Sequence, residues 1–455
     1  FEVPLSEFAG IPRSPLCYSV PSFIRELHNN DIKLDAEHAG TDDKSVGSTL
    51  PGIVTSDDDR FIRDFWEINN FGTFHPIAHG GAETWLVPQI TKTAEWHDDG
   101  RVMKRSSKSV RTPNEEWYGS PGLTWNRIKE TARRFGYYSG GLFSVNSFMF
   151  FPYDESSVWA KLAILNSKLY RCLALSQTIE RGWTADVVGS LPWIDELESV
   201  SRIEQIGTEL YNQTIRKRMD DPTSPYYNGP GLLPPDHSRS FYDHPHVERT
   251  SDILDSEQND IDEHTPISEA ATLVRNKKLE SEHEIENQLD KIDELIYDEL
   301  DVPAEVREGI TAEIFLRTDE TPQTDTEPES DSEVSIGLEE KVKNLINHFA
   351  VEAIREEKDG IIPLQGTESF ESMAEQVVSK FYETYGDHAE DRLVEVDEIL
   401  GTQSSAEEAY PNLRAFVAED LFDYHVDRME NTPIVWLLTT ERLVSDAAGE
   451  GFGCL

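Results

Sequence analysis

The chain has 455 residues, of which 41 are Lys or Arg and 87 are Asp or Glu, so its formal net charge is −46. Its 37% hydrophobic and 10% aromatic residues are enough for a folded core, which excludes wholesale disorder. The sequence has no apolar run of about 18 residues and no signal peptide, which argues against membrane and secreted proteins and favours a cytoplasmic location.

The first half of the chain predicts a mixture of strands and helices. Segments 83–90 and 142–151 are rich in strand-forming residues and follow glycine pairs. Apolar residues three or four positions apart predict helices at 156–176 and 197–218. The Pro- and Gly-rich segment 220–235 then interrupts all periodicity, and it is a candidate domain boundary.

The second half predicts mostly helices. After a polar stretch at 236–263, apolar residues at spacings of three and four predict a long helix at 281–300, paired in a hairpin with either 266–279 or 304–316. Residues 318–335 are acidic and of low complexity, so we expect a linker. Amphipathic helices are predicted at 338–357, 368–386 and 411–428.

We therefore expect an α+β fold, in which a mixed α/β domain precedes a mostly helical region with an acidic disordered linker. The expected divisions are a connecting segment 1–50, the mixed domain 51–235, a loop and helical hairpin 236–317, the linker 318–335 and a truncated helical domain 336–455. Because the chain begins with Phe1 rather than Met, we interpret it as an internal piece of a longer polypeptide.

The charge is distributed unevenly along the chain. Residues 1–235 hold 31 acidic and 24 basic side chains, a net of −7, whereas 236–455 hold 56 and 17, a net of −39. A globally acidic composition is typical of proteins from a high-salt cytoplasm, so a halophilic, haloarchaeal source is expected. An acidic interaction protein from an ordinary cytoplasm is the alternative.

Residues 101–134 carry a net positive charge, because they hold nine basic and three acidic side chains. Aromatic residues such as Trp117, Tyr118 and Trp125 are interleaved with these cations. Basic residues mixed with aromatics are typical of surfaces that bind phosphates and stack on bases, so this segment favours nucleic-acid contact. The alternative is a solvated basic loop that neutralises nearby acidic patches.

Three other patterns resemble chemical motifs, and we do not expect a metal site from any of them. His75 and His79 have helical spacing, but Pro76 lies between them and no acidic ligand is nearby. The run 57–59 of three aspartates favours a helix cap or a charge-paired turn. The glycine-rich segment 449–453 follows no strand–helix–strand pattern, and Cys17, Cys172 and Cys454 are too far apart in sequence for a disulfide framework or a zinc cluster.

One stretch, Gly52-Ile-Val-Thr-Ser-Asp-Asp-Asp-Arg60-Phe-Ile-Arg63-Asp-Phe-Trp66-Glu67, closely resembles a signature of large adenine-specific DNA methyltransferases. These are the enzymes of bacteriophage-exclusion (BREX) systems and related type II restriction–modification proteins. The signature is Gly-x-x-Thr-(Gly/Ser)-x-(Asn/Asp)-(Asp/Glu)-Arg-Phe-x-Arg-x-Trp-Glu, and it opens their target-recognition region. Ser56 stands where glycine is commoner.

Further segments resemble later elements of the same family, in the same order. They are Gly122-Leu-Thr-Trp125, the Phe-rich stretch and helix at 143–170, Asp186-Val-Val-Gly189-Ser-Leu-Pro192, the helix ending at 292–300, Asp359-Gly-Ile-Ile-Pro-Leu364 and Asn431-Thr-Pro-Ile-Val-Trp436, where Asn431-Thr replaces the usual arginine. The resemblance covers roughly residues 50–455.

The resemblance implies that this chain is the DNA-recognition portion of a site-specific adenine methyltransferase. The family's Gly-rich loop for S-adenosylmethionine and its Asn-Pro-Pro-(Tyr/Phe) loop are absent from the chain, so we expect both the cofactor and catalysis in a domain N-terminal to Phe1. No catalytic residue and no cofactor are expected in this segment.

Double-stranded DNA is the expected partner, and other proteins of a phage-exclusion system are further candidates. The alternatives are a non-enzymatic interaction module whose acidic half recruits proteins, and an enzyme that both methylates and cleaves DNA. The residues expected to contact DNA, which combine the signature arginines with the 101–134 segment, are Arg60, Arg63, Arg101, Lys104, Arg105, Lys108, Arg111, Trp125, Asn126, Arg127, Lys129, Arg133 and Arg134.

Overall fold

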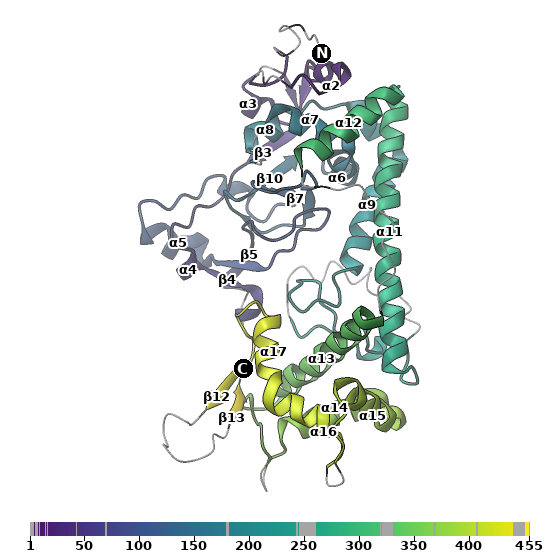
Figure 1. The fold of residues 1–455 in the computed structure, drawn as a ribbon. Coiled ribbons are helices and arrows are strands. Elements are labelled where there is room, and N and C mark those ends of the chain that lie inside the picture. Colours follow the sequence, from purple (N-terminus) through teal and green to yellow (C-terminus); the bar gives the residue numbers. More distant parts are fainter. Residues whose placement is uncertain are drawn as a thin grey trace. The chain divides into compact units, whose positions relative to one another are not determined.

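The structure is a computed structural model that describes residues 4, 8, 10–13, 15, 17–41, 43–68, 71–178, 182–242, 244, 261–318, 320, 331–366, 370–405, 408–439 and 451–454. The fold is α+β, and the chain divides into two compact units (Figure 1). The first unit contains Phe1–Arg216 and Ser281–Asp325, and the second contains Lys217–Glu280 and Thr326–Leu455. The expected segment 236–317 is therefore divided between the two units.

A four-stranded antiparallel sheet lies at the centre of the first unit, in the order β3-β10-β7-β8. Its strands are β3 (Gly47–Leu50), β7 (Gly122–Asn126), β8 (Gly136–Tyr138) and β10 (Ser147–Pro152). Every residue of β7 and β10 is buried, so both faces of the sheet are covered. Successive side chains of a strand point to opposite faces. Phe148 and Phe150 accordingly belong to the main core, whereas Met149 and Phe151 belong to a second cluster with Ala78.

Helices cover the face of this sheet that Phe148 and Phe150 occupy. The main core joins apolar residues of the sheet and of these helices, including Leu165, Leu173 and Ile206, to one side of the long helix α11, where Leu289 and Ile292 are buried. The helices are α2 (Ser22–Leu27), α3 (Ala36–Ala39), α6 (Val158–Asn166), α7 (Lys168–Gln177), α8 (Ala185–Gly189), α9 (Ser201–Arg216), α11 (Ile267–Glu299, which enters this unit at Ser281) and α12 (Ala304–Arg317).

A second, mixed sheet of the first unit has the order β4-β6-β5-β9. It consists of β4 (Ile62–Asp64), β5 (Phe74–Ala78), β6 (Lys92–Glu95) and β9 (Leu142–Phe143), and only the β5–β9 pair is parallel. Two helices flank it in sequence, α4 (Asp58–Phe61) and α5 (His97–Ser106). The remaining short elements of the unit are the parallel pair β1 (Ile32–Lys33) and β2 (Lys44–Ser45) and the 3₁₀ turns Phe65–Glu67, Glu115–Trp117, Glu155–Ser157 and Asp195–Ser199.

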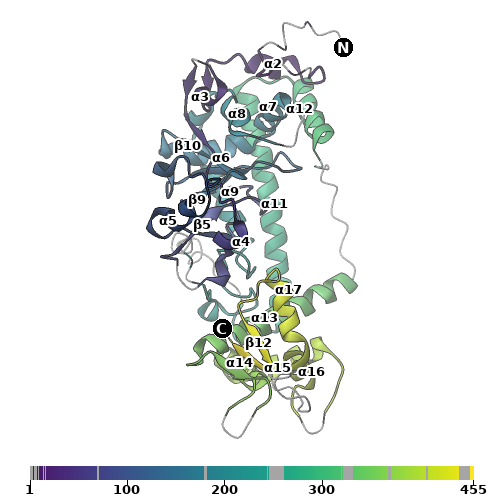
Figure 2. The same ribbon diagram turned by 90° about the vertical axis from the view of Figure 1, so that its left-hand side faces the viewer.

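The second unit is mostly helical, and Figure 2 shows its helices α13 to α17 gathered beside strand β12. The long helix α13 packs against α14, α15 and α17. A small antiparallel sheet has the order β11-β13-β12. The elements are α13 (Asp331–Glu356), β11 (Ile361–Pro363), α14 (Met373–Tyr385), α15 (Ala389–Leu400), α16 (Pro411–Ala415), a π-helix (Phe416–Asp420), α17 (Leu421–Arg428), β12 (Trp436–Thr439) and β13 (Gly451–Cys454), with 3₁₀ turns at Pro235–His237 and Gly386–His388.

Several elements differ from their sequence-based predictions. Segment 83–90 is not a strand, because Leu86 has a left-handed φ of 61° and only this residue forms an isolated bridge, to Gly136. The predicted helix 156–176 is two helices that meet at Ser167, whose side chain caps α7. Segment 266–279 is continuous with 281–300 in α11, so the partner of that helix in the hairpin is α12.

The expected acidic linker 318–335 lies largely outside the described residues. Within its described parts, Asp331 begins α13 and Glu320 contacts other residues of the first unit. The Glu320 side chain is only 10% exposed, and it pairs with Arg171 and accepts a hydrogen bond from the Ala132 N–H at 2.8 Å. Glu320 is thus a largely buried carboxylate within the stretch that was expected to be a linker. In the part of the chain that the structure describes, no helix has the length and apolarity that crossing a membrane requires.

Candidate nucleic-acid interface

We call residues 52–119 of the first unit, which include the strands β4, β5 and β6, the α5 lobe. Its own small core contains Phe61 of α4, Ile77 of β5, Ala94 of β6 and Met103 of α5. This core connects both helices to the strands, so α4 and α5 hold fixed positions on one sheet.

The segment that resembles the methyltransferase signature begins on the inner side of this lobe. Gly52 lies so close to Phe143 that a Cβ atom would be 1.9 Å from the Phe143 carbonyl oxygen, so only glycine fits here. The next residue, Ile53, donates a backbone hydrogen bond to that same oxygen at 2.8 Å. The signature glycine is thus required by the close packing of two backbone segments.

The same segment is joined to the end of the 101–111 run of cations. Val54 and Arg111 exchange two backbone hydrogen bonds, of 2.8 and 3.1 Å. Thr55 then donates its hydroxyl to Asp58 at the start of α4. Residues that are 57 positions apart in sequence are therefore neighbours, and the bridge brings Arg111 beside the chain that leads into α4 and Arg60.

Two cations of the α5 lobe have carboxylate partners. Arg101 pairs with Asp98 at 2.6 Å, and Lys104 pairs with Glu115 at 2.7 Å. Burial opposes ionisation of Glu115, but hydrogen bonds from Lys104 and Thr112 outweigh it and keep the pKa of this carboxyl below its usual value. These two cations are partly neutralised by the lobe itself.

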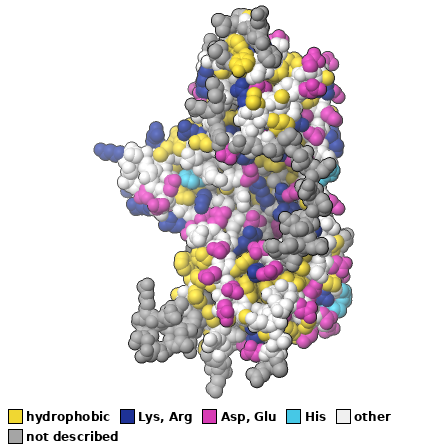
Figure 3. Space-filling model, viewed as in Figure 1, with side chains coloured by type: hydrophobic (Ala, Val, Ile, Leu, Met, Phe, Trp, Pro, Cys, Tyr) yellow, Lys and Arg dark blue, Asp and Glu magenta, His cyan; other side chains and the backbone are white. Residues whose placement is uncertain are grey.

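Three further cations on this lobe are exposed and unpaired. The side chains of Arg105, Lys108 and Arg111 form no hydrogen bond or ion pair with any residue that the structure describes. Arg60 is also exposed, and its guanidinium lies 4.9 Å from the centre of the Phe61 ring. Arg63 is half-buried and donates to the Asp59 and Ile62 carbonyls. Figure 3 shows Lys and Arg side chains over the area where Figure 1 places α4 and α5.

The expected contact residues at 125–126 and Arg134 are instead buried, which corrects the sequence-based prediction. Trp125 is fully buried and its indole N–H donates to the Trp183 carbonyl at 2.9 Å. Asn126 is 5% exposed and donates to the Ala82 carbonyl. Arg134 is 2% exposed and lies 4.3 Å from the centre of the Trp183 ring. These side chains hold the protein together and have no surface to offer to DNA.

Arg134 shapes the loop that contains the remaining cations. Its guanidinium donates to the carbonyl oxygens of Asn126, Arg127, Lys129 and Thr131 at 2.6 to 3.3 Å. Burial lowers the pKa of Arg134 to about 9. Because this value is still above 7, the side chain is charged at neutral pH. This one charge thus binds four backbone carbonyl groups of the loop at once.

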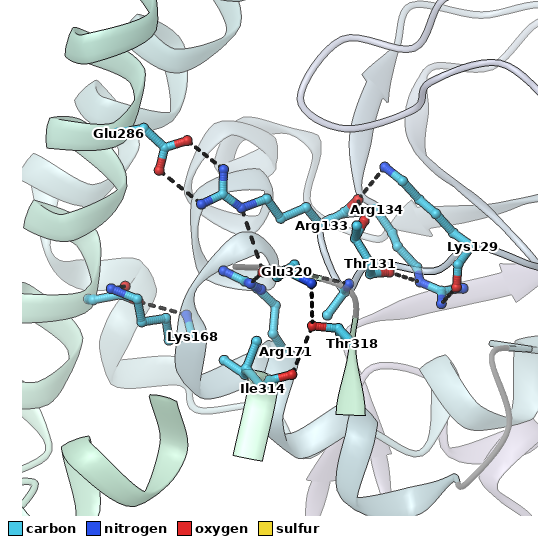
Figure 4. A network of polar contacts seen from close by, with 12 residues as sticks. Lys129, Thr131, Arg133, Arg134, Lys168, Arg171, Glu286, Ile314, Thr318 and Glu320 are labelled. Atoms are coloured by element: carbon cyan, nitrogen blue, oxygen red, sulfur yellow. Dashed lines mark hydrogen bonds and ion pairs between the residues drawn. The ribbon is translucent and has the colours of Figure 1, made fainter. Parts of the chain in front are cut away.

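Lys129 and Arg133 are also occupied within the first unit. Lys129 pairs with Glu83 at 2.5 Å and donates to the Arg133 carbonyl. Arg133 pairs with Glu286 of α11 and lies 4.7 Å from the centre of the Trp85 ring. Figure 4 shows Arg133 directed at Glu286, with Glu320 and Arg171 beside it. Among the cations at 127–134, only Arg127 has an exposed side chain without an ion pair to a described residue.

The aromatic residues of this segment do not form a stacking surface. Trp117 stacks on Phe151 with ring centres 4.8 Å apart, and Tyr118 packs edge-on against Trp96 and Phe143. They connect the α5 lobe to the central sheet. An exposed apolar residue that the sequence did not single out is Ile128, which is 70% exposed next to Arg127. Its position between two cations, in a loop without apolar periodicity, is the only sequence signal for it.

The other suspected motifs have structural explanations. His79 lies 3.1 Å from Asp58 and so pairs the end of β5 with α4. The aspartates at 57–59 begin α4, and no group of three potential metal ligands exists among the described residues. The glycine-rich segment 449–453 is described only from Gly451, where it forms β13. Cys17 and Cys172 are buried free thiols.

Comparison with known protein families finds no family model that matches this chain. A comparison with curated proteins likewise finds none that is significantly similar.

Proposed function

We propose that this chain is the DNA-recognition portion of a site-specific adenine DNA methyltransferase, and that its α5 lobe binds the phosphate backbone of double-stranded DNA. Transfer of the methyl group from S-adenosylmethionine to the adenine amine would take place in a catalytic portion that precedes this segment. A cytoplasmic location and a role in phage defence belong to the same proposal. Its basis is the ordered set of family motifs together with the charges of the α5 lobe.

The observation that carries the DNA-binding part is the trio Arg105, Lys108 and Arg111. In a chain with a net charge of −46, these cations are exposed and have no carboxylate partner among the described residues. Exposed cations without partners attract phosphates and release counterions when they bind them. Arg60 of the signature lies on the same lobe and adds a fourth candidate contact.

The backbone at the signature supports the resemblance independently of charge. Ser56 has a φ of 61°, in the left-handed region that favours glycine, and it stands where the family more often has glycine. Gly52, which the signature also requires, lies where no other residue fits. Both positions therefore have a physical reason to be restricted in the way that the family signature restricts them.

The test is DNA binding by the triple variant Arg105→Ala/Lys108→Ala/Arg111→Ala, measured by fluorescence anisotropy with a labelled duplex over a series of salt concentrations. Each lost phosphate contact should make the negative slope of log K against log salt concentration less steep by about 0.9. The slope of the triple variant should therefore be less steep than the native slope by about 2.7. The control is Lys44→Ala/Arg202→Ala/Lys291→Ala, which removes three exposed cations from the same unit but outside the α5 lobe. If the first variant binds with the native affinity and slope, the α5 lobe is not the interface.

The methyltransferase part has a separate test, the coding sequence upstream of Phe1. It should encode a Gly-rich cofactor loop and an Asn-Pro-Pro-(Tyr/Phe) motif. If a complete upstream frame encodes neither, the catalytic assignment is wrong, and a non-enzymatic DNA-binding module becomes the better description. A nuclease motif in the same frame would instead indicate the combined restriction–methylation enzyme.

A further inference from the structure

The second unit contains a cavity that the proposed function does not use. It has a volume of about 240 Å³ and lies between α13, the π-helix, α17 and β12. Its floor is apolar and buried, with Val351 and Ile354 of α13, Met373 of α14 and Val417 of the π-helix each no more than 2% exposed. An apolar cavity of about 150 Å³ already admits benzene in another protein, so this one has room for more than one aromatic or branched side chain.

Several residues that line the cavity are exposed to solvent. Ala418, Glu419 and Asp423 line the cavity and are exposed, and Trp436 of β12, which also lines it, is 57% exposed. Figure 3 shows hydrophobic side chains at the surface beside α17. A buried apolar floor with an exposed rim is the form of a site that receives apolar groups from outside.

A buried histidine connects the elements that line the cavity. His425 of α17 contacts Asn347 of α13 through Nδ1 at 2.9 Å, and its Nε2 accepts hydrogen bonds from the backbone N–H groups of Ile434 and Val435. Because Nε2 accepts, the ring is neutral and Nδ1 carries the proton. This one side chain therefore fixes the segment that leads into β12 relative to the two helices.

A π-helix lines part of the cavity. Residues Phe416–Asp420 form this wider turn between α16 and α17, and they place Val417, Ala418 and Glu419 on the cavity. Such turns are rare and are found frequently at functional sites, because they redirect side chains that a regular helix would place elsewhere. The π-helix is an observation independent of the cavity itself.

The rim has a definite charge. Glu419 and Asp423 form no ion pair with any described residue. Two like charges at this spacing repel one another, and a cation placed between them would remove that repulsion. An occupant of the cavity should therefore carry positive charge next to its apolar groups.

From these observations we infer that the cavity is a docking site for an amphipathic segment of a partner protein, whose apolar side chains enter it and whose Lys or Arg residues face Glu419 and Asp423. Grooves that bind the apolar face of a helix are a recurrent mode of peptide recognition. The inference rests on the second unit alone, so it does not depend on the proposed DNA-binding function.

The test uses the full chain and a synthetic amphipathic peptide of leucine and lysine with its leucines on one helical face. Ala418→Trp places a large side chain at an exposed position that lines the cavity, and it should weaken peptide binding about tenfold or more, since the leucines lose their burial. The control Ala409→Trp, at an exposed position that does not line the cavity, should change affinity less than about twofold. Trp436→Ala provides a second variant, because it removes a wall without filling the cavity.

Two further measurements separate docking from general attraction to an acidic surface. Methyl signals of Ile354 and Met373 should shift when the peptide binds. Glu419→Gln/Asp423→Asn should weaken binding about two- to fivefold. The matched double variant Asp387→Asn/Asp391→Asn, at exposed positions that do not line the cavity, should leave peptide binding unchanged.

Equal binding by the native protein and the Ala418→Trp and Trp436→Ala variants, or unchanged methyl signals, would overturn the inference. Equal binding of a peptide with glutamate in place of lysine would overturn the assigned charge of the partner. Entry of benzene without any peptide binding would assign the cavity to small apolar molecules instead.

Discussion

Arg133 donates two hydrogen bonds to the two carboxylate oxygens of Glu286, at 2.5 and 2.9 Å. The two residues are 153 positions apart, one in the basic segment and one in the acidic helix α11. The planar guanidinium matches the carboxylate in this arrangement, which is among the stronger polar contacts in proteins. A cation that composition alone assigns to a DNA surface is thus part of the contact between a loop and a helix of the first unit.

The first prediction compares Arg133 with Arg105. Arg133→Ala should lower the free energy of unfolding by about 1–3 kcal/mol, because Glu286 loses its partner and the Trp85 ring loses its cover. Arg105→Ala should change stability by less than about 0.5 kcal/mol, since its side chain is exposed. Urea denaturation measures both. DNA affinity should show the opposite order, with the larger loss in Arg105→Ala. A larger loss of DNA affinity in Arg133→Ala would contradict the assignment of Arg133 to the fold and of Arg105 to DNA binding.

The second prediction concerns Glu320, the only carboxylate that pairs with the buried Arg171 among the described residues. Glu320→Ala should destabilise the protein by about 3 kcal/mol or more, because it leaves a buried charge without its counterion. Glu305→Ala, at an exposed position in α12, is the control and should have little effect. If thermal unfolding shows the same midpoint for both variants, Glu320 does not pair with the buried Arg171 as described.

The third prediction is a pH dependence that arises from His425. Burial lowers the pKa of His425 to about 4, below the 6.5 of the unfolded chain. Between these two pH values the unfolded state therefore binds more protons than the folded state. The contribution of His425 to the free energy of unfolding is fully present above about pH 6.5, and it is lost as the pH falls towards 4. This group alone should reduce stability by about 2 kcal/mol between pH 7.5 and pH 5.

Urea denaturation of the native protein and of His425→Gln over this pH range isolates that contribution. Burial also lowers the pKa of His28 and of His348, each to about 3, and both contribute in the same direction. The relevant quantity is therefore the difference in the free energy of unfolding between the native protein and His425→Gln. This difference should become smaller as the pH falls. A constant difference would mean that His425 is not held neutral by burial.

The fourth prediction concerns the left-handed backbone at Ser56. Ser56→Gly should stabilise the protein by about 0.5–1 kcal/mol, because glycine adopts a φ of this sign without the steric cost that a Cβ atom brings. Ser56→Ala should not stabilise it, since alanine has the same Cβ. Denaturant midpoints of the three proteins test this, and a midpoint of the glycine variant below the native one would argue against the left-handed conformation.

The sequence by itself determined the fold class, most of the helices and the regional distribution of charge. The spacing of Ile285, Leu289, Ile292, Ile296 and Leu300 predicts one apolar face. The first four are buried in α11, whereas Leu300 follows the end of the helix and is half-buried. The helices predicted at 197–218 and 338–357 correspond to α9 and α13. Such predictions succeed because helical periodicity depends on residues only three or four positions apart.

Only the tertiary structure decided which cations are free. Arg105 and Arg134 belong to the same basic segment, and the sequence does not distinguish them. Arg105 is nevertheless exposed, whereas Arg134 is buried, with 2% of its surface exposed. The difference arises from partners that lie far away in sequence, such as Trp183 for Arg134 and Glu286 for Arg133. The cavity of the second unit was equally unpredictable. A net charge or a basic run counts the ionisable groups, whereas packing decides which of them are desolvated and paired and which remain available to a ligand.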